Sequence, residues 1–126
     1  MIAGLGTDIV EIARIEAALE RTPRLAQRIL TDAELVQFRQ SNTPARFLAK
    51  RFAAKEAAVK ALGTGIGQGV GWHQLSVYHA DGGRPLLALS GRAAEIATGL
   101  DITDWHLSYS DERCYVVATV IAEVRG

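Results

Sequence analysis

Residues 45–62 form the segment that most restricts how this chain can fold. The segment is rich in Ala, Lys, Glu and Leu, which favour a helix, and Gly63 follows it as a helix stop. One side of the predicted helix carries an alanine at every fourth position: Ala49, Ala53, Ala57 and Ala61. Because alanine side chains are small, another element can approach this side closely. The spacing therefore predicts a long helix with a closely packed neighbour.

The other side of this helix mixes large apolar side chains with charged ones. Arg51 and Lys55 fall within an apolar arc that also contains Phe47, Leu48, Phe52, Ala58, Val59 and Leu62. Glu56 lies at the edge of the arc, and Lys60 lies one turn further on. Solubility does not require charges in an apolar arc, so we favour a functional role. The alternative is a Glu56–Lys60 surface pair, worth a few tenths of a kcal/mol.

Shorter elements precede and follow this helix. Thr31 and Glu34 fit a capping box at the start of one of them. The pattern of apolar and turn residues predicts a strand at 2–10, helices at 11–20, at 25–30 and from Thr31, strands at 75–79 and 85–89, a helix at 90–99, and strands at 105–110 and 115–124. Hairpins and helices mix without regular alternation. This order predicts a single α+β domain over residues 1–126 with a largely antiparallel sheet.

Charge is unevenly distributed along the chain, although the formal net charge is zero. Residues 21–60 contain nine Arg and Lys residues but only three carboxylates. A local positive field concentrates anionic partners, whereas the alternative is a solvated basic helical face. A basic segment also suits nucleic acid. We see none of the alternation of aromatic and basic residues that would stack bases, which makes a nucleic-acid-binding protein the minor interpretation.

The length, cysteine content and N-terminus predict where the protein acts. A chain of 126 residues with 48% hydrophobic content suits one compact domain. Cys114 is its only cysteine, so no disulfide forms within one chain, as is typical of a reducing compartment. The N-terminus lacks the basic region of a signal peptide, and no apolar run is long enough to span a membrane. We therefore expect a cytoplasmic protein.

Asp8 and a run of glycines are further candidates for a functional site. Asp8 lies in the apolar sequence 6–10, where a carboxylate is costly to bury unless a cation or donors satisfy it. The alternative is a strand-end aspartate that caps the next helix. Glycines alternate from Gly63 to Gly71, and such a run lets backbone N–H groups approach a phosphate. The run matches no P-loop, so a flexible turn is the alternative.

Weaker candidates are the histidines and the tip of the last hairpin. The three histidines lack metal-ligand spacing, so core or surface positions are the better interpretation: His73, His79 and His106. Asp111, at the hairpin tip, is either a turn former or a general base. No Gly-x-Ser-x-Gly motif indicates a serine hydrolase.

Two segments together resemble the signature motifs of a known enzyme family. The segment Gly6–Arg14, GTDIVEIAR, is similar to the N-terminal signature of the holo-(acyl carrier protein) synthases, which are 4′-phosphopantetheinyl transferases. The segment Arg51–Gly65, RFAAKEAAVKALGTG, is similar to their second signature. The order and separation of the motifs also fit, and the resemblance covers nearly the whole chain. It implies a small α+β subunit that forms a homotrimer with active sites between subunits.

The resemblance also implies roles for individual residues. Asp8 and Glu56 match the family's Mg²⁺ ligands, and Lys60 matches a lysine near the phosphates of coenzyme A. Other positions match the coenzyme A site: Arg51, Gly63, Thr64, Gly65 and Pro85. A third set matches basic positions that meet the acidic carrier protein: Arg14, Arg21, Arg24 and Arg28. In one departure, Asp111 stands where some members have a histidine, so no histidine chemistry carries over.

The implied reaction moves 4′-phosphopantetheine from coenzyme A to a serine of apo acyl carrier protein, in support of fatty acid biosynthesis. It requires Mg²⁺ and releases adenosine 3′,5′-bisphosphate. The nucleophile is on the partner, and Asp111, Glu56 or a water held by the metal are candidates for its base. Lys60 stabilises or protonates the leaving group. The alternative is a non-catalytic coenzyme A- or nucleotide-binding module, which would not need the carboxylate pair formed by Asp8 and Glu56.

Overall fold

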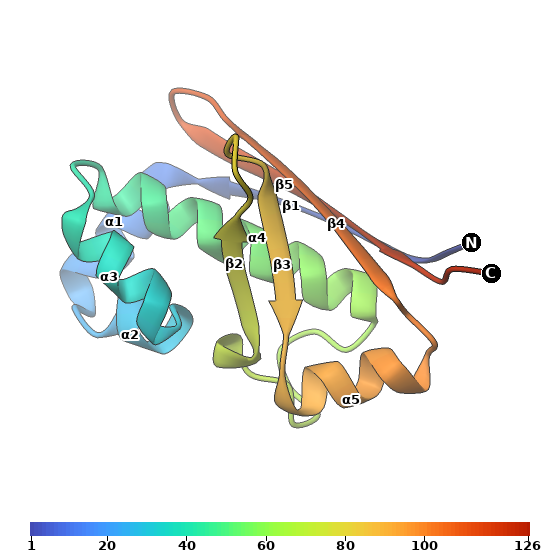
Figure 1. Cartoon of the computed structure of the whole chain (residues 1–126). Helices are drawn as coiled ribbons and strands as arrows, with labels where there is room; N and C mark the ends of the chain where they lie inside the picture. Colours follow the sequence, from blue (N-terminus) through green and yellow to red (C-terminus); the bar gives the residue numbers. More distant parts are fainter.

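A long central helix lies between two antiparallel sheets (Figure 1). The computed structural model describes residues 1–126. The elements are β1 (Ile2–Glu11), α1 (Ile12–Arg21), α2 (Leu25–Ile29), α3 (Asp32–Gln40), α4 (Pro44–Leu62), η1 (Trp72–Gln74), β2 (Leu75–His79), β3 (Pro85–Leu89), α5 (Gly91–Gly99), β4 (Asp104–Asp111) and β5 (Tyr115–Glu123). The predicted α+β class and the predicted order of helices and strands along the chain are confirmed. The short 3₁₀ turn η1 was not predicted.

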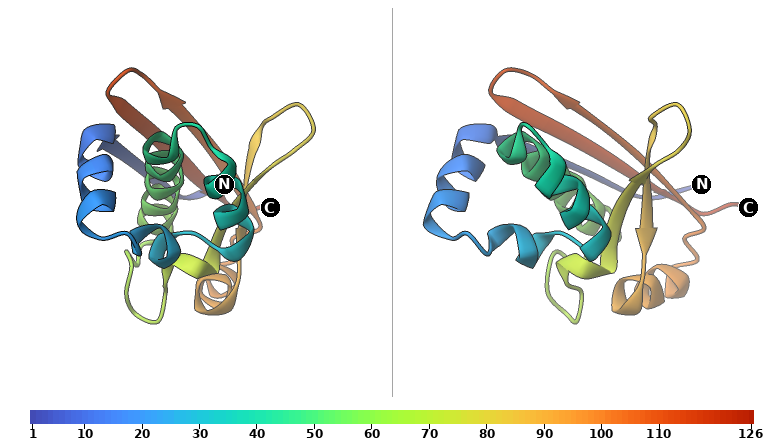
Figure 2. Two further views of the ribbon diagram at one scale, coloured as in Figure 1. Left: turned by 90° about the vertical axis from the view of Figure 1, so that its left-hand side faces the viewer. Right: turned by 60° about the vertical axis from the view of Figure 1, so that its left-hand side comes forward.

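The strands divide into two sheets. The larger sheet has the order β1-β5-β4, with β5 pairing antiparallel to both neighbours. The hairpin of β2 and β3 forms the second sheet on the other side of α4, and Figure 2 shows its turn projecting away from the helices. The antiparallel pairing expected from the hairpins is therefore correct. The division into two sheets was not expected: β3 contacts β4, but no ladder of backbone hydrogen bonds joins the two sheets.

The close approach predicted from the alanine stripe of α4 is made by β1. A Cβ atom added to Gly4 would lie 2.0 Å from the carbonyl oxygen of Ala61, and one added to Gly6 would lie 1.9 Å from that of Ala57. Two glycines and two alanines thus let the strand backbone rest directly on the helix backbone. This contact fixes where the side chains of β1 lie relative to the side chains of α4.

The core lies around α4 and the inner face of the larger sheet. The buried side chains of β5 are Val116, Ala118, Val120 and Ala122, in the strict alternation of a half-covered strand. Helices α1, α2 and α3 cluster near the N-terminal part of α4, and α5 lies towards its C-terminal end (Figures 1 and 2). No helix combines the length and the apolar character that crossing a membrane would require.

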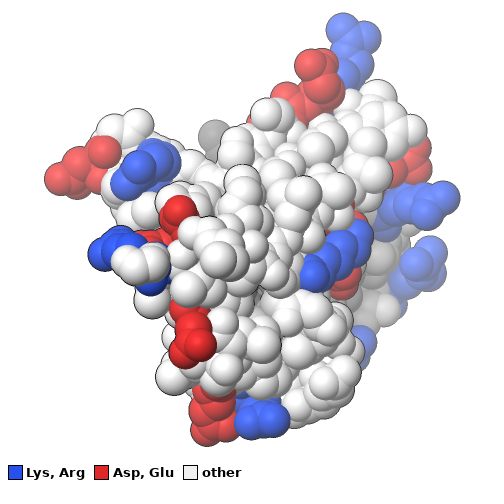
Figure 3. All heavy atoms as spheres, turned by 90° about the vertical axis from the view of Figure 1, so that its right-hand side faces the viewer, with Lys and Arg blue, Asp and Glu red and all other residues white.

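The outer face of the larger sheet carries exposed apolar side chains on β1 and β5. Leu5 and Ile9 of β1 are 64% and 65% exposed, and Val117 of β5 is 40% exposed. The strand register places Leu5 opposite Ile121 and Ile9 opposite Val117, with Thr7 opposite Thr119 between these two apolar pairs. Figure 3, drawn from the side where the termini lie, shows most charged side chains towards the edges of that view, with one basic cluster to the right of its middle. Exposed apolar side chains grouped on one face are typical of a protein–protein interface.

Candidate active site

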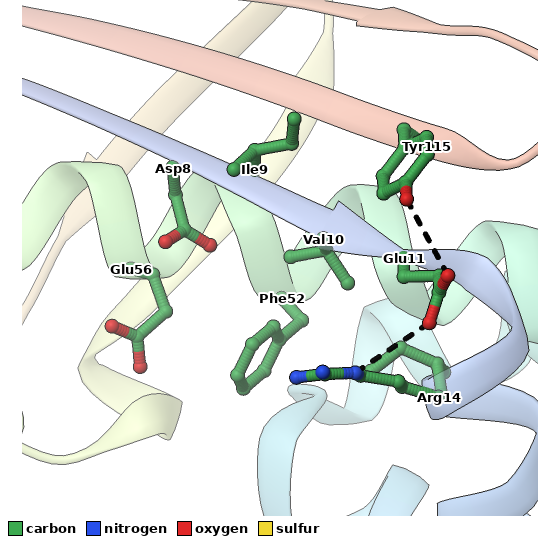
Figure 4. Close-up of a pocket in the computed structure, with 9 residues that line it drawn as sticks. Asp8, Ile9, Val10, Glu11, Arg14, Phe52, Glu56 and Tyr115 are labelled. Carbon is green, nitrogen blue, oxygen red and sulfur yellow. Dashed lines mark hydrogen bonds and ion pairs between the residues drawn. The ribbon is translucent and has the colours of Figure 1, made fainter.

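Asp8 and Glu56 meet in one pocket, although they are far apart in the sequence. Asp8 belongs to β1 and Glu56 to α4, and the close packing at Gly4 and Gly6 brings the two elements together. Both carboxylates line the same pocket of about 630 Å³, into which their side chains point (Figure 4). The structure therefore joins the carboxylates of the two signature segments in a single site.

Lys60 completes this group from the next turn of α4. Its Nζ atom lies 2.9 Å from Asp8 Oδ1 and donates a second hydrogen bond, also 2.9 Å long, to the carbonyl oxygen of Thr7. Glu56 makes no ion pair with Lys60 in this structure, so the simple surface pair is not formed. The lysine side chain is 47% exposed, so its ammonium group remains accessible from solvent.

The electrostatics of the pair suit a cation. Burial and the neighbouring Asp8 carboxylate raise the pKa of Glu56 above its ordinary value, while Lys60 partly opposes that shift. Two carboxylates at one place are a donor set that Mg²⁺ accepts, because this ion takes one or two protein carboxylates and fills its shell with phosphates and water. No group of three or more His, Cys, Asp and Glu residues surrounds them. The residues present therefore fit Mg²⁺ bound together with a phosphate substrate.

The rest of the pocket is mainly apolar. Its wall is formed by Ile9, Val10, Ile15, Phe52 and Tyr115, and its far rim by Glu11 and Arg14. Figure 4 shows Phe52 between the carboxylates and the Arg14 side chain. From the sequence, Phe52 was expected only in the apolar arc of the helix and Tyr115 only in a strand. Neither residue belongs to a sequence pattern that marks the wall of a pocket.

The glycine run after α4 begins as a helix cap. Gly63 adopts the left-handed conformation with φ of 88°, which confirms the predicted helix stop. The backbone N–H groups of Gly63, Thr64 and Gly65 all donate to the carbonyl oxygen of Val59. These three donors therefore close the end of the helix, and contacts of this segment with coenzyme A remain a prediction.

Arg51 and Lys55 lie in the interior of the chain and do not line this pocket. Lys55 is fully buried, and its Nζ atom donates to Glu34 Oε1 at 2.6 Å. Arg51 donates to Gln37 Oε1 and to the hydroxyl of Tyr109, both at 3.2 Å. The charges in the apolar arc thus form an interior polar network within one chain. Arg51 is buried in this chain, and its predicted role in coenzyme A binding stays a prediction.

Glu34 is an interior carboxylate, although its sequence pattern predicted only a capping box at the start of a helix. The capping box with Thr31 is present, since Thr31 N–H donates to Glu34 Oε1 at 2.9 Å. The same carboxylate also binds Lys55 and accepts the N–H of Val77 at 2.8 Å. No local pattern marks this second role, because Lys55 and Val77 come from α4 and β2, far along the chain.

Asp111 and Pro85 do not line the pocket either. Asp111 pairs with Arg46 at 2.7 Å and with Lys50 at 3.3 Å. Although burial works in the opposite direction, hydrogen bonds from these two cations hold the pKa of Asp111 below its ordinary value. A carboxylate held in this way is a weaker proton acceptor. Pro85 begins β3 in the second sheet. Their predicted roles stay predictions.

The arginines predicted to meet a partner are all exposed on α1, α2 and the segment between them: Arg14, Arg21, Arg24 and Arg28. Of these, Arg14 lines the pocket itself. The basic surface therefore begins at the rim of the pocket that holds the carboxylate pair.

Comparison with known proteins identifies the class of enzyme to which this fold and site belong. Residues 4–120 match the model of the 4′-phosphopantetheinyl transferase superfamily. The chain therefore belongs to this superfamily, and it is a transferase of the holo-[acyl-carrier-protein] synthase family. A holo-[acyl-carrier-protein] synthase of Vibrio cholerae is 62% identical over 126 residues, which cover 99% of this chain and 100% of the relative.

Solved structures extend this similarity to the whole fold. The holo-[acyl-carrier-protein] synthase of Neisseria meningitidis aligns with a TM-score of 0.91 and 42% identity, covering 98% of this chain and 99% of that chain. The corresponding enzyme of Bacillus anthracis, solved in complex with CoA (3′,5′-ADP), aligns with a TM-score of 0.83 and 37% identity over 99% of both chains.

Proposed function

We propose that this protein transfers 4′-phosphopantetheine from coenzyme A to a serine hydroxyl of apo acyl carrier protein in a Mg²⁺-dependent reaction. The observation that carries the proposal is the meeting of Asp8 and Glu56 in one pocket, with Lys60 hydrogen-bonded to Asp8, in a chain that belongs to this transferase family. The CoA complex of the Bacillus anthracis relative supports the choice of donor. The product is holo acyl carrier protein, which would serve fatty acid biosynthesis.

Asp8 and Glu56 would hold the metal. When bound, Mg²⁺ neutralises charge on the pyrophosphate of coenzyme A and aligns it for attack. The serine oxygen of the carrier forms a bond to the phosphorus that carries pantetheine. The bond from that phosphorus to the bridging oxygen breaks, and adenosine 3′,5′-bisphosphate leaves. The serine proton passes to a base, for which Asp111 is a weak candidate because Arg46 and Lys50 lower its pKa.

Lys60 would stabilise the leaving group. An ammonium group has three N–H donors, and two of them point to Asp8 and Thr7. The third is available for a phosphate oxygen, and the partly exposed position of the side chain gives a ligand access to it. Asp8 and Thr7 would thereby orient the lysine, so that its positive charge lies near the leaving-group phosphate on which negative charge develops.

The direct test is to incubate the protein with coenzyme A, Mg²⁺ and an apo acyl carrier protein, and to weigh the carrier by intact mass spectrometry. We expect the carrier to gain one phosphopantetheine group, and the gain to disappear when a chelator removes the metal. Coenzyme A binding without any gain in mass would instead favour the non-catalytic binding module.

The arginines at the pocket rim and on α1 are expected to serve the carrier protein. Arg14→Ala and Arg21→Ala should each raise the carrier KM by about three- to ten-fold and leave the KM for coenzyme A nearly unchanged, because rim charges steer an acidic partner. The effect should shrink at high salt. Steady-state kinetics with each substrate varied in turn measures this, with Arg39→Ala on α3 as the matched control. Equal effects on both substrates would contradict the assignment.

We further propose a homotrimer in which the outer face of the larger sheet is the contact between copies. Val117 lies on the central strand of that face. Val117→Glu is expected to convert the oligomer to monomer at micromolar concentration, because a carboxylate cannot be buried there without a partner. Light scattering after gel filtration measures the mass. The control is Val36→Glu, at an exposed valine of α3. A trimeric V117E or a monomeric wild type would refute the proposal.

A further inference from the structure

Arg46, near the start of α4, holds the tip of the β4–β5 hairpin. Its Nη1 atom donates to Asp111 Oδ2 and to the carbonyl oxygen of Glu112, both at 2.7 Å. Its Nη2 atom donates to the carbonyl oxygen of Arg113 at 3.1 Å. Lys50 pairs with the carboxylate, with Nζ 3.3 Å from Asp111 Oδ1, and lies over the Tyr109 ring. Arg46 therefore binds the backbone of the hairpin tip, whereas Lys50 makes no hydrogen bond to the tip carbonyl groups.

The fastened tip in turn holds the beginning of α1. The backbone N–H of Ile12, the first residue of α1, donates to the carbonyl oxygen of Cys114 at 2.8 Å. The N-cap residue Glu11 makes no side-chain hydrogen bond to the helix. Because the first N–H groups of a helix have no partner inside it, the Cys114 carbonyl satisfies a donor that the cap leaves free. The hairpin tip thus adds a hydrogen bond at the start of α1, next to the pairing of Glu11 with Tyr115 in the sheet.

This junction forms the rim of the candidate active site. Glu11, Arg14 and Tyr115 all line the pocket that holds Asp8 and Glu56. Glu11 links the two sides of the rim, with Oε2 at 3.5 Å from the Tyr115 hydroxyl and Oε1 at 3.5 Å from Arg14 Nε (Figure 4). Arg46 does not line this pocket, so any effect of Arg46 on the rim passes through the tip.

We propose that Arg46 is a positioning residue for the carrier-protein substrate. By fixing the carbonyl groups of the hairpin tip, it holds the first turn of α1 and places Arg14 at the pocket rim. The inference rests on the proposed function, in which Arg14 meets the carrier. It adds a residue on α4 that acts on carrier binding without touching the carrier, coenzyme A or the metal ligands.

The test compares Arg46→Ala with Lys50→Ala, because both variants remove a cation beside Asp111 but only the first releases the tip carbonyls. Hydrogen exchange measured by mass spectrometry should be faster in R46A for peptides covering residues 10–16 and 110–116, and close to wild type in K50A. In kinetics, R46A should raise the carrier KM at least about three-fold and leave the KM for coenzyme A nearly unchanged. K50A should leave both KM values close to those of the wild type.

A double variant separates positioning from general damage. If Arg46 acts through Arg14, adding R46A to R14A should raise the carrier KM little further, because the two changes remove the same contact. Additive effects, a raised KM for coenzyme A, or unchanged exchange at residues 10–16 would each overturn the proposal. A wild type without transferase activity would refute the proposed function, while the exchange comparison would still decide whether Arg46 anchors α1. If R46A does not fold, Arg46→Gln takes its place.

Discussion

Glu56→Gln is expected to reduce Mg²⁺-dependent transfer by at least about 100-fold, since even residues that only support metal ligands cost 10- to 100-fold. The same change should make the metal-free protein more stable at neutral pH. Burial and the Asp8 carboxylate disfavour the charged form of Glu56, and glutamine removes that charge while keeping the shape. A loss of activity together with a gain in melting temperature would distinguish a functional carboxylate from a structural one.

The sign of the pH dependence follows from the raised pKa of Glu56. A carboxyl group whose pKa is higher in the folded state contributes stability when it is protonated, below its ordinary value of 4.5. That contribution is lost as the pH rises through the folded pKa. The stability difference between E56Q and the wild type should therefore be largest near neutral pH and vanish below about pH 4. Thermal unfolding in the presence of a chelator measures it, with Glu16→Gln on α1 as the control.

Asp8→Asn supplies the contrasting variant. It should lose activity to a similar extent, because it removes the other predicted metal ligand. Unlike E56Q it should not gain stability, since Asp8 is the carboxylate that pairs with Lys60 at 2.9 Å. Full activity of either variant at limiting Mg²⁺ would contradict the ligand assignment. Equal stabilisation by D8N and E56Q would contradict the electrostatic account of the site.

Glu34→Ala is expected to destabilise the fold by about 3–5 kcal/mol, because it leaves a buried charge without its partner. Lys55 would keep only the carbonyl oxygens of Ile29 and Trp72, at 2.7 and 3.3 Å, and the N–H of Val77 would lose its acceptor. Burial already lowers the pKa of Lys55, and the Glu34 carboxylate partly opposes this shift. Chemical denaturation of the variant and the wild type gives the difference in unfolding free energy.

A double-mutant cycle tests whether the pair acts as a unit. Lys55→Met removes the ammonium group but keeps a long apolar side chain, and Glu34→Gln keeps an acceptor for Val77. The double variant E34Q/K55M should be clearly more stable than the sum of the single changes predicts, because neither Glu34 nor Lys55 is then left as a buried charge without the other. Additive free energies would show that Glu34 and Lys55 contribute separately. Glu112→Ala provides the control, because it makes the same Glu-to-Ala change at the exposed hairpin tip.

Much of the fold was predictable because its elements are defined by local patterns. The α4 helix, its glycine stop and both hairpins follow from propensity, periodicity and turn residues. The capping box of Thr31 and Glu34 was also predicted and is present. The division into two sheets could not be predicted, because pairing of β1 with β5 joins the two ends of the chain. No short-range pattern reports a contact over that separation.

The candidate site was likewise predictable only in part. The two motifs identified Asp8, Glu56 and Lys60 as candidates, and the resemblance supplied their roles. The alanine stripe predicted that some element would pack closely on α4, but only the structure shows that β1 does so, through Gly4 and Gly6. That contact turns two separate motifs into one pocket.

The sequence by itself determined which helices and strands form, which residues are candidates for the chemistry, and which family the chain resembles, because each depends on neighbouring residues or on a motif read along the chain. Only the tertiary structure decided which charges become interior. Lys55 is buried against Glu34, whereas Lys60, a little more than one turn further along α4, remains partly exposed beside Asp8. The physical reason is that burial depends on what packs against each side of the helix, and those elements come from distant parts of the chain.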